Sequence, residues 1–508
     1  MCAAALASAR ARGGAVGGAA LRIGDRRQLF IDDRLIDIAG TRKVTRTMNP
    51  PAAIRRVLAP DRPWEALGFI FYCSVVEDAG TAKLFYGSYS YDTERRRHFN
   101  LALSEDGLHW RRADVGLREF GGNKDNNILP ISAVEASVFL DPRSVPEKRY
   151  RLLYTRDWPN PMTAGVFTAS SPDGVRWAIA PDRLLPFLPD SQPSVCWDEA
   201  LRKYAVYLRA WNPGRSVARV AVDDLERPWP YDHSIAPRHH WGKDKIPTLS
   251  RELPTVMARD ERDPENLQLY TSAVVRYPFA DDAYLAFPAA YLLFDGPDWA
   301  GRELNKNDGI FEVQMASGRD GVTWDRWRPP YISSGFHDGT DLRLVSMGHG
   351  MIRRGRFLYQ YFVGWPYTHG RPTHWEKDAG DRAHWLGRDR GGIYCAMQRV
   401  DGFISMDAPY EGGSLLTRPL IFDGDRLSLN IHTAGSGIAR VALLDEDGGP
   451  LDGFSEADCE AINADDLDYE VRWKSGPDVG ALAGKPVRVR ITMRNTKLYE
   501  MQFTHDAR

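Results

Sequence analysis

The chain has 508 residues, of which 43% are apolar and 11% aromatic, and this is enough to bury a large core. Its charged residues nearly balance, at a formal net charge of −2, so the composition predicts neither a nucleic-acid partner nor an acidic one. No run of about 18 apolar residues occurs, so the sequence predicts no membrane-spanning helix and no membrane partner.

Residues 1–25 are expected to form a disordered or processed tail. The segment is rich in Ala, Gly and Arg, but Arg10 and Arg12 interrupt the apolar run that a signal peptide needs. The cysteines are widely spaced without a C-x-x-C pair, which argues against a zinc site and a disulfide framework and favours a reducing compartment. We therefore expect a cytoplasmic protein without a metal or cofactor, and an axial cation held by carboxylates stays an open alternative.

Five segments follow a short entry strand at residues 29–36, and they share one plan. Each begins with a polar or acidic lead, continues into an apolar strand and a turn, and returns as an aromatic-rich strand. This is the pattern of an antiparallel β-unit. The apolar strands are expected at residues 69–76, 135–139, 192–197, 269–275 and 344–352.

A second repeat lies near the end of these units. The sequence Ser-Glu-Asp-Gly-Leu-His-Trp at 104–110 returns as Ser-Pro-Asp-Gly-Val-Arg-Trp at 171–177 and as Gly-Arg-Asp-Gly-Val-Thr-Trp at 318–324. Asp accepts hydrogen bonds from the turn amides, Gly takes a positive φ, and Trp fills the layer below. The pattern predicts structural turns, with weaker copies at Asp224 and Asp401.

Five β-units with loops of unequal length predict an all-β fold, a five-bladed β-propeller at residues 26–411. An ordinary β-sandwich that reuses one turn is the alternative. Long insertions at 226–266 and 366–391 are expected to line the mouth of the propeller, the end of its axis at which a site forms. Alternating strands at residues 412–508 predict a small antiparallel β-sandwich.

This architecture resembles the invertase-type glycoside hydrolases of family 32 and their relatives in families 43 and 68. The chain also resembles a group of bacterial family-32-like proteins in a few short segments. These segments are residues 29–36, Pro63-Trp-Glu65, residues 399–403 and residues 498–503. The resemblance implies a five-bladed propeller, a C-terminal β-sandwich and hydrolysis of a glycosidic bond, whereas the substrate does not follow because one propeller hosts many functions.

The chain departs from the invertase-type pattern at its catalytic motifs. It lacks their Asn-Asp-Pro-Asn-Gly nucleophile motif, and the third-blade lead, Asp190-Ser-Gln192, offers no glutamate. Arg262-Asp-Pro264 occurs in the lead to the fourth blade, where we expect a turn. Alignment of the second-blade strand places Glu135 where the stabilising aspartate of these enzymes stands.

Glycoside hydrolysis needs two carboxyl groups facing the scissile bond. The innermost strands of a propeller converge on its axis, so acidic residues that lead these strands are the natural candidates. The candidate catalytic residues are Glu65, Glu135, Asp190 and Asp341. Acidic residues also sit at solvated sheet ends, so a surface carboxylate is the alternative for each of them.

Five residues are candidates for substrate binding: Arg209, His349, His369, Trp365 and Asp33. Arg209 would pair with a carboxylate or hold a sugar hydroxyl, and a salt bridge between blades is its alternative. His349 lies between two glycines that allow close backbone approach, and a satisfied core histidine is its alternative. His369 and Trp365 lie where a sugar ring would stack, and a loop packed against its neighbour is their alternative. Asp33 is more simply explained by the entry turn.

Together these features predict a glycoside hydrolase that acts on a glycoside or oligosaccharide by carboxylate acid/base catalysis. Two alternatives stay open. One is a non-catalytic carbohydrate-binding propeller, which the missing nucleophile motif favours. The other is a different propeller sugar enzyme, either a phosphorylase that would use Arg209 and His349 to hold phosphate, or a lyase.

Overall fold

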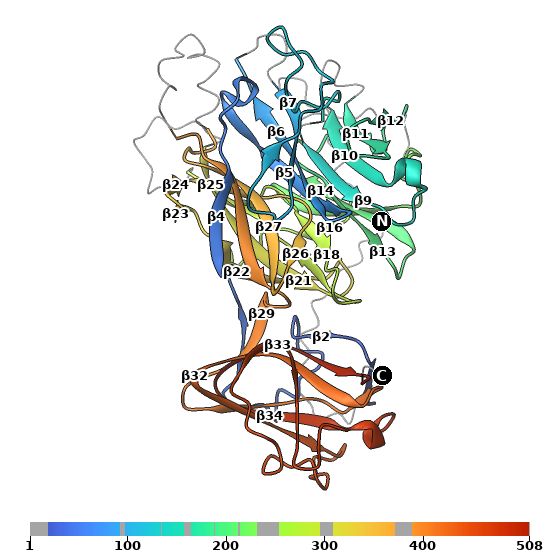
Figure 1. The fold of residues 1–508 in the computed structure, drawn as a ribbon, viewed down its shortest axis with the longest axis vertical. Coiled ribbons are helices and arrows are strands. Elements are labelled where there is room, and N and C mark those ends of the chain that lie inside the picture. Colours follow the sequence, from blue (N-terminus) through green and yellow to red (C-terminus); the bar gives the residue numbers. More distant parts are fainter. Residues whose placement is uncertain are drawn as a thin grey trace, which may run out of the picture. The chain divides into compact units, whose positions relative to one another are not determined.

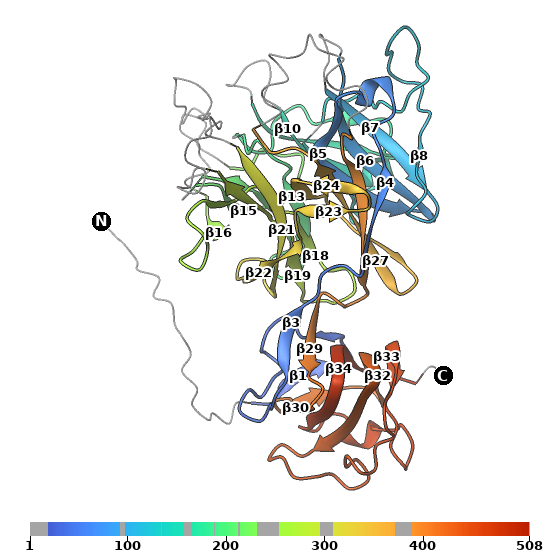
Figure 2. The same ribbon diagram turned by 90° about the vertical axis from the view of Figure 1, so that its left-hand side faces the viewer.

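The computed structural model describes residues 19–91, 97–133, 135–156, 164–186, 188–211, 214–230, 253–294, 308–370 and 389–506. The chain divides into two compact units, one formed by Thr47–Ser405 and the other by the residues up to Arg46 together with Met406–Arg508 (Figures 1 and 2). Both units are built from β-strands, which confirms the all-β prediction. No helix in the described ranges has the length and apolar character needed to cross a membrane.

The larger unit is a five-bladed β-propeller (Figure 1). From the axis outwards, blade 1 consists of β5 (Gly68–Asp78), β6 (Thr81–Tyr89), β7 (Arg97–Ser104) and β8 (Arg111–Arg112). Blade 2 consists of β9 (Ala136–Leu140), β10 (Tyr150–Arg156), β11 (Gly165–Ser171) and β12 (Ala178–Ile179). Blade 3 consists of β13 (Ser194–Asp198), β14 (Lys203–Ala210), β15 (Ser216–Val222) and β16 (Thr255–Met257). The central strands are buried on both faces because each blade packs between two others, which explains their continuous apolar runs.

The fourth blade has a split inner half. β17 (Leu267–Leu269) and β18 (Val274–Arg276) share the innermost position, and β20 (Ala289–Leu293) and β19 (Tyr284–Ala286) share the next. The long strand β21 (Gly309–Gly318) pairs with both β19 and β20 and carries the outer strand β22 (Asp325–Ile332).

The fifth blade is assembled from two distant parts of the chain. β25 (Leu344–Met347), β27 (Phe357–Trp365) and β28 (Gly392–Arg399) come from the end of the propeller sequence, and β26 (Ile352–Arg354) adds to β27. The outermost strand is β4 (Ala53–Leu58), which precedes the first blade and pairs with β28. This pairing closes the ring, and no repeat in the sequence marks it.

A layer of buried serines crosses the axis, one from each innermost strand or its lead. The five are Ser74, Ser137, Ser194, Ser272 and Ser346. Four of them join neighbouring blades at equivalent positions, whereas the hydroxyl of Ser346 makes no hydrogen bond to the described residues. The hydroxyl of Ser74 donates to the Ala136 carbonyl (3.1 Å), that of Ser137 donates to the Pro193 carbonyl, and those of Ser194 and Ser272 lie 2.6 Å apart. The serine layer therefore fixes one register for the innermost strands and separates the two ends of the axis.

The Asp-Gly turns are structural, as their sequence predicts. In each copy the aspartate accepts two backbone amides two and three residues ahead, at 2.7–3.0 Å, for example those of Val322 and Thr323 on Asp320. The turn also packs on a neighbouring blade, since the hydroxyl of Tyr207 in blade 3 donates to the carbonyl of Gly321 in blade 4 (2.9 Å). These turns therefore join blades to one another as well as closing hairpins.

We expect Gly321→Ala to lower the free energy of unfolding by about 2 to 4 kcal/mol. Gly321 has a φ of +66°, and an added Cβ would lie 2.3 Å from the Tyr207 hydroxyl oxygen. Gly116→Ala is the matched control, because Gly116 has a φ of +61° but open space around it. Urea unfolding of both variants gives two losses of unfolding free energy, and the difference between them is the cost of the contact with Tyr207. Equal losses in the two variants would contradict this cost.

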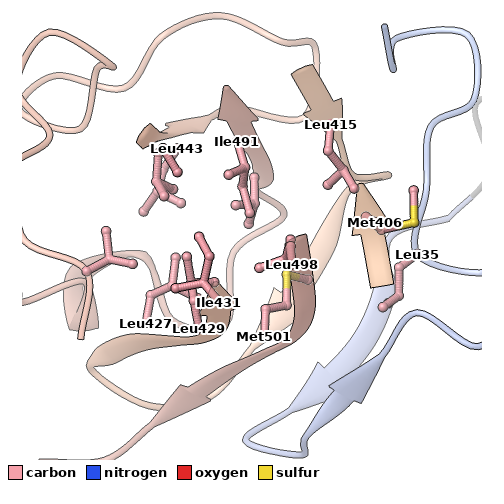
Figure 3. Close-up of a cluster of buried hydrophobic side chains, with 14 of the residues drawn as sticks. Leu35, Met406, Leu415, Leu427, Leu429, Ile431, Leu443, Ile491, Leu498 and Met501 are labelled. Carbon is pink, nitrogen blue, oxygen red and sulfur yellow. The ribbon is translucent and has the colours of Figure 1, made fainter. Parts of the chain in front are cut away.

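The smaller unit is an antiparallel sandwich built mainly on two long strands. β32 (Arg426–Leu444) and β34 (Arg488–Thr504) pair along most of their length. The other strands are β1 (Leu21–Gly24), β2 (Gln28–Leu29), β3 (Thr45–Met48), β29 (Ile404–Ala408), β30 (Gly413–Leu416), β31 (Leu420–Phe422) and β33 (Asp465–Glu470). Alternate residues of β32, Leu427, Leu429 and Ile431, enter the core (Figure 3).

The N-terminal strands belong to this sandwich, whereas the sequence placed residues 26–46 in the propeller and residues 21–24, which form β1, in a disordered or processed tail. Leu35 lies in the same core as Met406 and Leu415, β1 pairs in parallel with β31, and β2 pairs with β34 (Figure 3). Hydrophobic alternation does not reveal which sheet a strand joins, because pairing depends on partners far away in the sequence.

Candidate active site at the mouth of the propeller

The mouth is the end of the axis at which the innermost strands begin. Four residues precede their strand's serine and come from different blades: Tyr72 in β5, Glu135 before β9, Asp190 before β13, and Tyr270 between β17 and β18. The leads of blades 2 and 3 lie side by side, since Thr155 of β10 donates from its amide to the Glu135 carbonyl (3.3 Å) and from its hydroxyl to the Ser191 carbonyl (3.2 Å). Burial, together with the nearby Tyr270 and the charge of Glu135, raises the pKa of the Tyr72 hydroxyl. The structure thus brings two of the four candidate carboxylates, Glu135 and Asp190, to one place.

Asp190 is held in an ion pair with Arg209 of β14. One guanidinium nitrogen of Arg209, Nη2, donates to both the carboxylate and the carbonyl of Asp190, and Nε donates to the Pro189 carbonyl (2.8 Å). The Arg209 side chain is fully buried and that of Asp190 is 25% exposed. Burial alone would lower the pKa of Arg209, but the charge of Asp190 raises it. Arg209, which was predicted to pair with a carboxylate or hold a sugar hydroxyl, thus pairs with Asp190 in its own blade.

A second buried guanidinium, that of Arg215, lies beside the first. Its Nη1 donates to the side-chain oxygen of Gln268 (2.6 Å), and its Cζ lies 4.8 Å from the ring centre of Trp211 and 5.2 Å from that of Tyr291. Burial and the neighbouring positive charge of Arg209 lower the pKa of Arg215. Nothing in the local sequence pattern sets Arg215 apart, so the pattern did not predict its place in the mouth.

His369 completes one wall of the mouth. Its Nε2 lies 3.0 Å from the hydroxyl of Tyr270, its Nδ1 lies 3.2 Å from that of Tyr291, and its ring stacks on Phe71. Trp365 packs on Phe71 at 4.1 Å between ring centres and is buried. Trp365 therefore supports the wall from behind, while His369 lies among the polar groups.

Tyr72 and Tyr270 are polar residues of the mouth that the sequence analysis did not select. Burial, with nearby negative charge, raises the pKa of both hydroxyls, so both stay neutral and able to donate near neutral pH. The Tyr72 hydroxyl makes no hydrogen bond to the described part of the chain. A repeated feature of the sequence could have identified them, because each innermost strand or its lead contains a serine, and the residues just before that serine lie at the mouth.

The structure places Glu65 away from the axis. Its fully buried carboxylate faces the outermost strand β8, where Arg112 donates from Nε (2.9 Å) and Nη2 (2.6 Å). The Tyr86 hydroxyl and the Asp61 amide also donate to it, at 2.7 and 3.2 Å. Glu65 is thus the acidic half of a buried ion pair inside blade 1.

Asp341 and Asp33 are not at the mouth either. Asp341 lies on the hairpin of β23 (Gly335–His337) and β24 (Thr340–Leu342), exposed and paired with Arg343 (2.6 Å). Asp33 belongs to the sandwich unit and lies 3.7 Å from Arg46. Both are partly solvated carboxylates on other surfaces, because the lead of a strand does not by itself decide where a side chain points.

His349 lies on the other side of the serine layer. It lines a cavity of about 530 Å³ with residues at the far ends of the innermost strands, such as Val138 and Arg276. Its amide donates to the Cys73 carbonyl (2.8 Å) and its carbonyl accepts from the Val75 amide (2.9 Å). A Cβ at Gly350 would lie 2.3 Å from the Val75 carbonyl oxygen, so the flanking glycine serves close approach of backbone to β5.

We expect His349 to make the propeller less stable in mild acid. Burial lowers the pKa of His349 to about 4 from 6.5, so below pH 6.5 the unfolded chain binds a proton that the folded chain refuses. Stability contributed by the neutral ring is complete above pH 6.5 and falls by about 3 kcal/mol by pH 4. Melting temperatures across this range should fall less in His349→Gln than in the wild type. His432→Gln, at an exposed histidine, is the control and should leave the profile unchanged.

Within the described ranges, no group of three or more His, Cys, Asp or Glu side chains is arranged to hold a metal ion. The described cysteines, Cys73, Cys196, Cys395 and Cys459, are free thiols. Much of the two predicted insertions, including the histidines at 233, 239, 240, 374 and 384, lies outside the described residues.

No family model and no curated protein sequence matches the chain. Similar solved structures include a thermostable family-43 glycoside hydrolase (12% identity, 71% of this chain and 95% of that one, TM-score 0.38). Others are a Bacillus subtilis family-43 arabinoxylan arabinofuranohydrolase (12%, 89% and 99%, 0.36) and the Bombyx mori family-32 β-fructofuranosidase (12%, 93% and 96%, 0.38). The chain is thus similar to propellers of the two families that its sequence resembles, at a distance that assigns no reaction.

Proposed function

We propose that the mouth is the active site of a glycoside hydrolase. The observation that supports this most is the pair of carboxyl groups, Glu135 and Asp190, which lead adjacent innermost strands that Thr155 joins through hydrogen bonds to the Glu135 and Ser191 carbonyls. Hydrolysis of a glycosidic bond needs one carboxyl group as proton donor and a second that is ionised. The surrounding phenols and guanidinium groups are donors suited to the hydroxyls of a sugar.

The different surroundings of the two carboxyl groups suggest their roles. Asp190 is ion-paired with Arg209 and is the charged partner that faces the oxocarbenium-like transition state. Glu135 is then the general acid. As the glycosidic C–O bond breaks, Glu135 gives its proton to the leaving oxygen, water adds to the anomeric carbon, and a carboxylate of the pair takes the proton that water loses. Tyr72 and Tyr270, as neutral phenols, orient the sugar.

The test is hydrolysis of a panel of para-nitrophenyl glycosides by wild-type protein and by Glu135→Gln. The glutamine keeps the size of the side chain but has no proton to give. Glu105→Gln, at an exposed carboxylate on the first Asp-Gly turn, is the matched control. Wild-type and control activity with loss in Glu135→Gln supports the proposal, and equal turnover in all three proteins contradicts the role of Glu135.

A β-elimination reaction is a second candidate, which the clustering of phenols, His369 and two guanidinium groups favours. Proton abstraction next to a sugar carboxylate needs a base and a cation that neutralises the carboxylate. Elimination creates a C=C bond that absorbs in the ultraviolet, and hydrolysis does not, so product absorbance separates the two reactions. The phosphorylase alternative has no such support, because Arg209 and His349 lie on opposite sides of the serine layer.

A further inference from the structure

We propose that the sugar bound at the mouth carries a carboxylate, as in a uronic acid, and that Arg209 and Arg215 bind this group. This inference deepens the proposed function and rests on it for the site, although binding can be tested apart from hydrolysis. The ion pair with Asp190 accounts for Arg209, whereas the acid/base pair does not account for Arg215. A pair of carboxyl groups needs at most one cation to stay ionised, and the described part of this mouth holds two.

The first observation is the incomplete hydrogen bonding of Arg209. Its Nε and Nη2 are occupied by Pro189 and Asp190, whereas its buried Nη1 has no hydrogen-bond partner among the described residues. A buried donor on a cation is costly to leave unpaired. A carboxylate oxygen is the acceptor that a guanidinium binds best.

The second observation is the closeness of the two guanidinium groups. Both have Cζ over the ring of Tyr270, at 4.5 Å for Arg209 and 5.4 Å for Arg215, and each is at least 93% shielded from solvent. Burial, and after it the positive charge of Arg209, lower the pKa of Arg215. Two like charges in a buried site are stabilised when an anion binds between or beside them.

The third observation is the balance of charge that catalysis requires. With Glu135 protonated as the acid, the described side chains of Asp190, Arg209 and Arg215 carry one negative and two positive charges beside the Tyr270 ring. A neutral sugar would leave this buried excess of one positive charge in place. A sugar with one carboxylate neutralises it, so the catalytic protonation state itself favours an acidic substrate.

The experiment compares para-nitrophenyl glucuronide and galacturonide with the matching neutral glucoside and galactoside, together with a sulfated glucoside that has the same charge in another shape. We expect the wild type to prefer the uronides. Arg215→Gln should lower the ratio of uronide to neutral kcat/KM by about 10- to 100-fold. Arg215→Lys, which keeps the charge without the fork, should give an intermediate ratio, and Arg353→Gln, at an exposed arginine, should leave the ratio unchanged.

Different results would overturn the acidic substrate class and the proposed hydrolase. If neutral glycosides are cleaved at least as well as uronides, the acidic substrate class is overturned and the hydrolase stands. If the sulfated glucoside is cleaved better than the uronides, the proposal that the site binds a carboxylate is overturned as well. If no glycoside is cleaved, calorimetric binding of glucuronate, galacturonate and glucose decides. Uronate binding that is weakened in the folded Arg215→Gln protein supports the carboxylate site, and binding without preference for the acids overturns it.

Discussion

Asp190→Asn is expected to lower kcat/KM for the cleaved glycoside by about 100- to 10,000-fold, the range typical for removal of a catalytic carboxylate. Asparagine keeps the size of the side chain and can still accept a hydrogen bond from Arg209. It lacks the negative charge that would face the oxocarbenium-like transition state. It also leaves the fully buried charge of Arg209 without its ion-pair partner. Steady-state kinetics on the best glycoside of the panel measures the loss.

The pH profile separates a catalytic Asp190 from one that only holds Arg209 in place. An ionised catalytic carboxylate produces an acid limb in kcat/KM, and this limb should disappear in Asp190→Asn. Asp182→Asn, at an exposed aspartate in the same blade-2 to blade-3 connection, is the matched control and should keep both activity and profile. Retention of the acid limb in a weakly active Asp190→Asn protein would assign Asp190 to positioning instead.

Glu65→Gln is expected to lower the free energy of unfolding by about 3 to 5 kcal/mol, because it breaks a buried ion pair from one side. The glutamine oxygen can still accept a hydrogen bond from Arg112, but the only charged partner left to this guanidinium among the described residues is Asp61 at 2.9 Å, which is 59% exposed. Denaturant unfolding measures the loss through the midpoint at an unchanged slope. Asp61→Asn, which removes the exposed partner of the same arginine, is the control and should cost less than about 1 kcal/mol.

The same variant decides whether Glu65 takes part in catalysis. Folded Glu65→Gln protein at low temperature should keep its kcat, since the carboxylate faces β8 rather than the axis. Loss of kcat without loss of stability would return Glu65 to the catalytic candidates.

Local chemistry explains what the sequence predicted well. An Asp-Gly turn is specified within about seven residues, because the aspartate bonds the amides of its own turn and glycine supplies the positive φ. The turns at Asp106, Asp173 and Asp320 therefore formed as expected, and their spacing predicted the five blades. The position of Glu135 and Asp190 near the axis followed as well, because the polar lead of an innermost strand lies at its start.

Two other strand leads show that the position of a residue before a strand does not predict where its side chain lies. Glu65 and Asp341 precede blade strands just as Glu135 does, yet one enters an ion pair with β8 and the other lies in solvent. Arg215 has no local signature and becomes part of the mouth only when the blades meet. The serine at each innermost strand was visible in every repeat, but its meaning depends on the neighbouring blades that it bonds.

By itself, the sequence determined the β-units, their turns and the number of blades, because each of these depends on contacts within a few residues. The tertiary structure decided that β4 closes the fifth blade, that residues 19–46 join the sandwich, and which acidic side chains share the mouth. These outcomes depend on strand pairing between segments that are far apart in the sequence and on which neighbours surround each side chain in the folded protein. No single stretch of the chain specifies either the distant partner of a strand or the surroundings of a side chain.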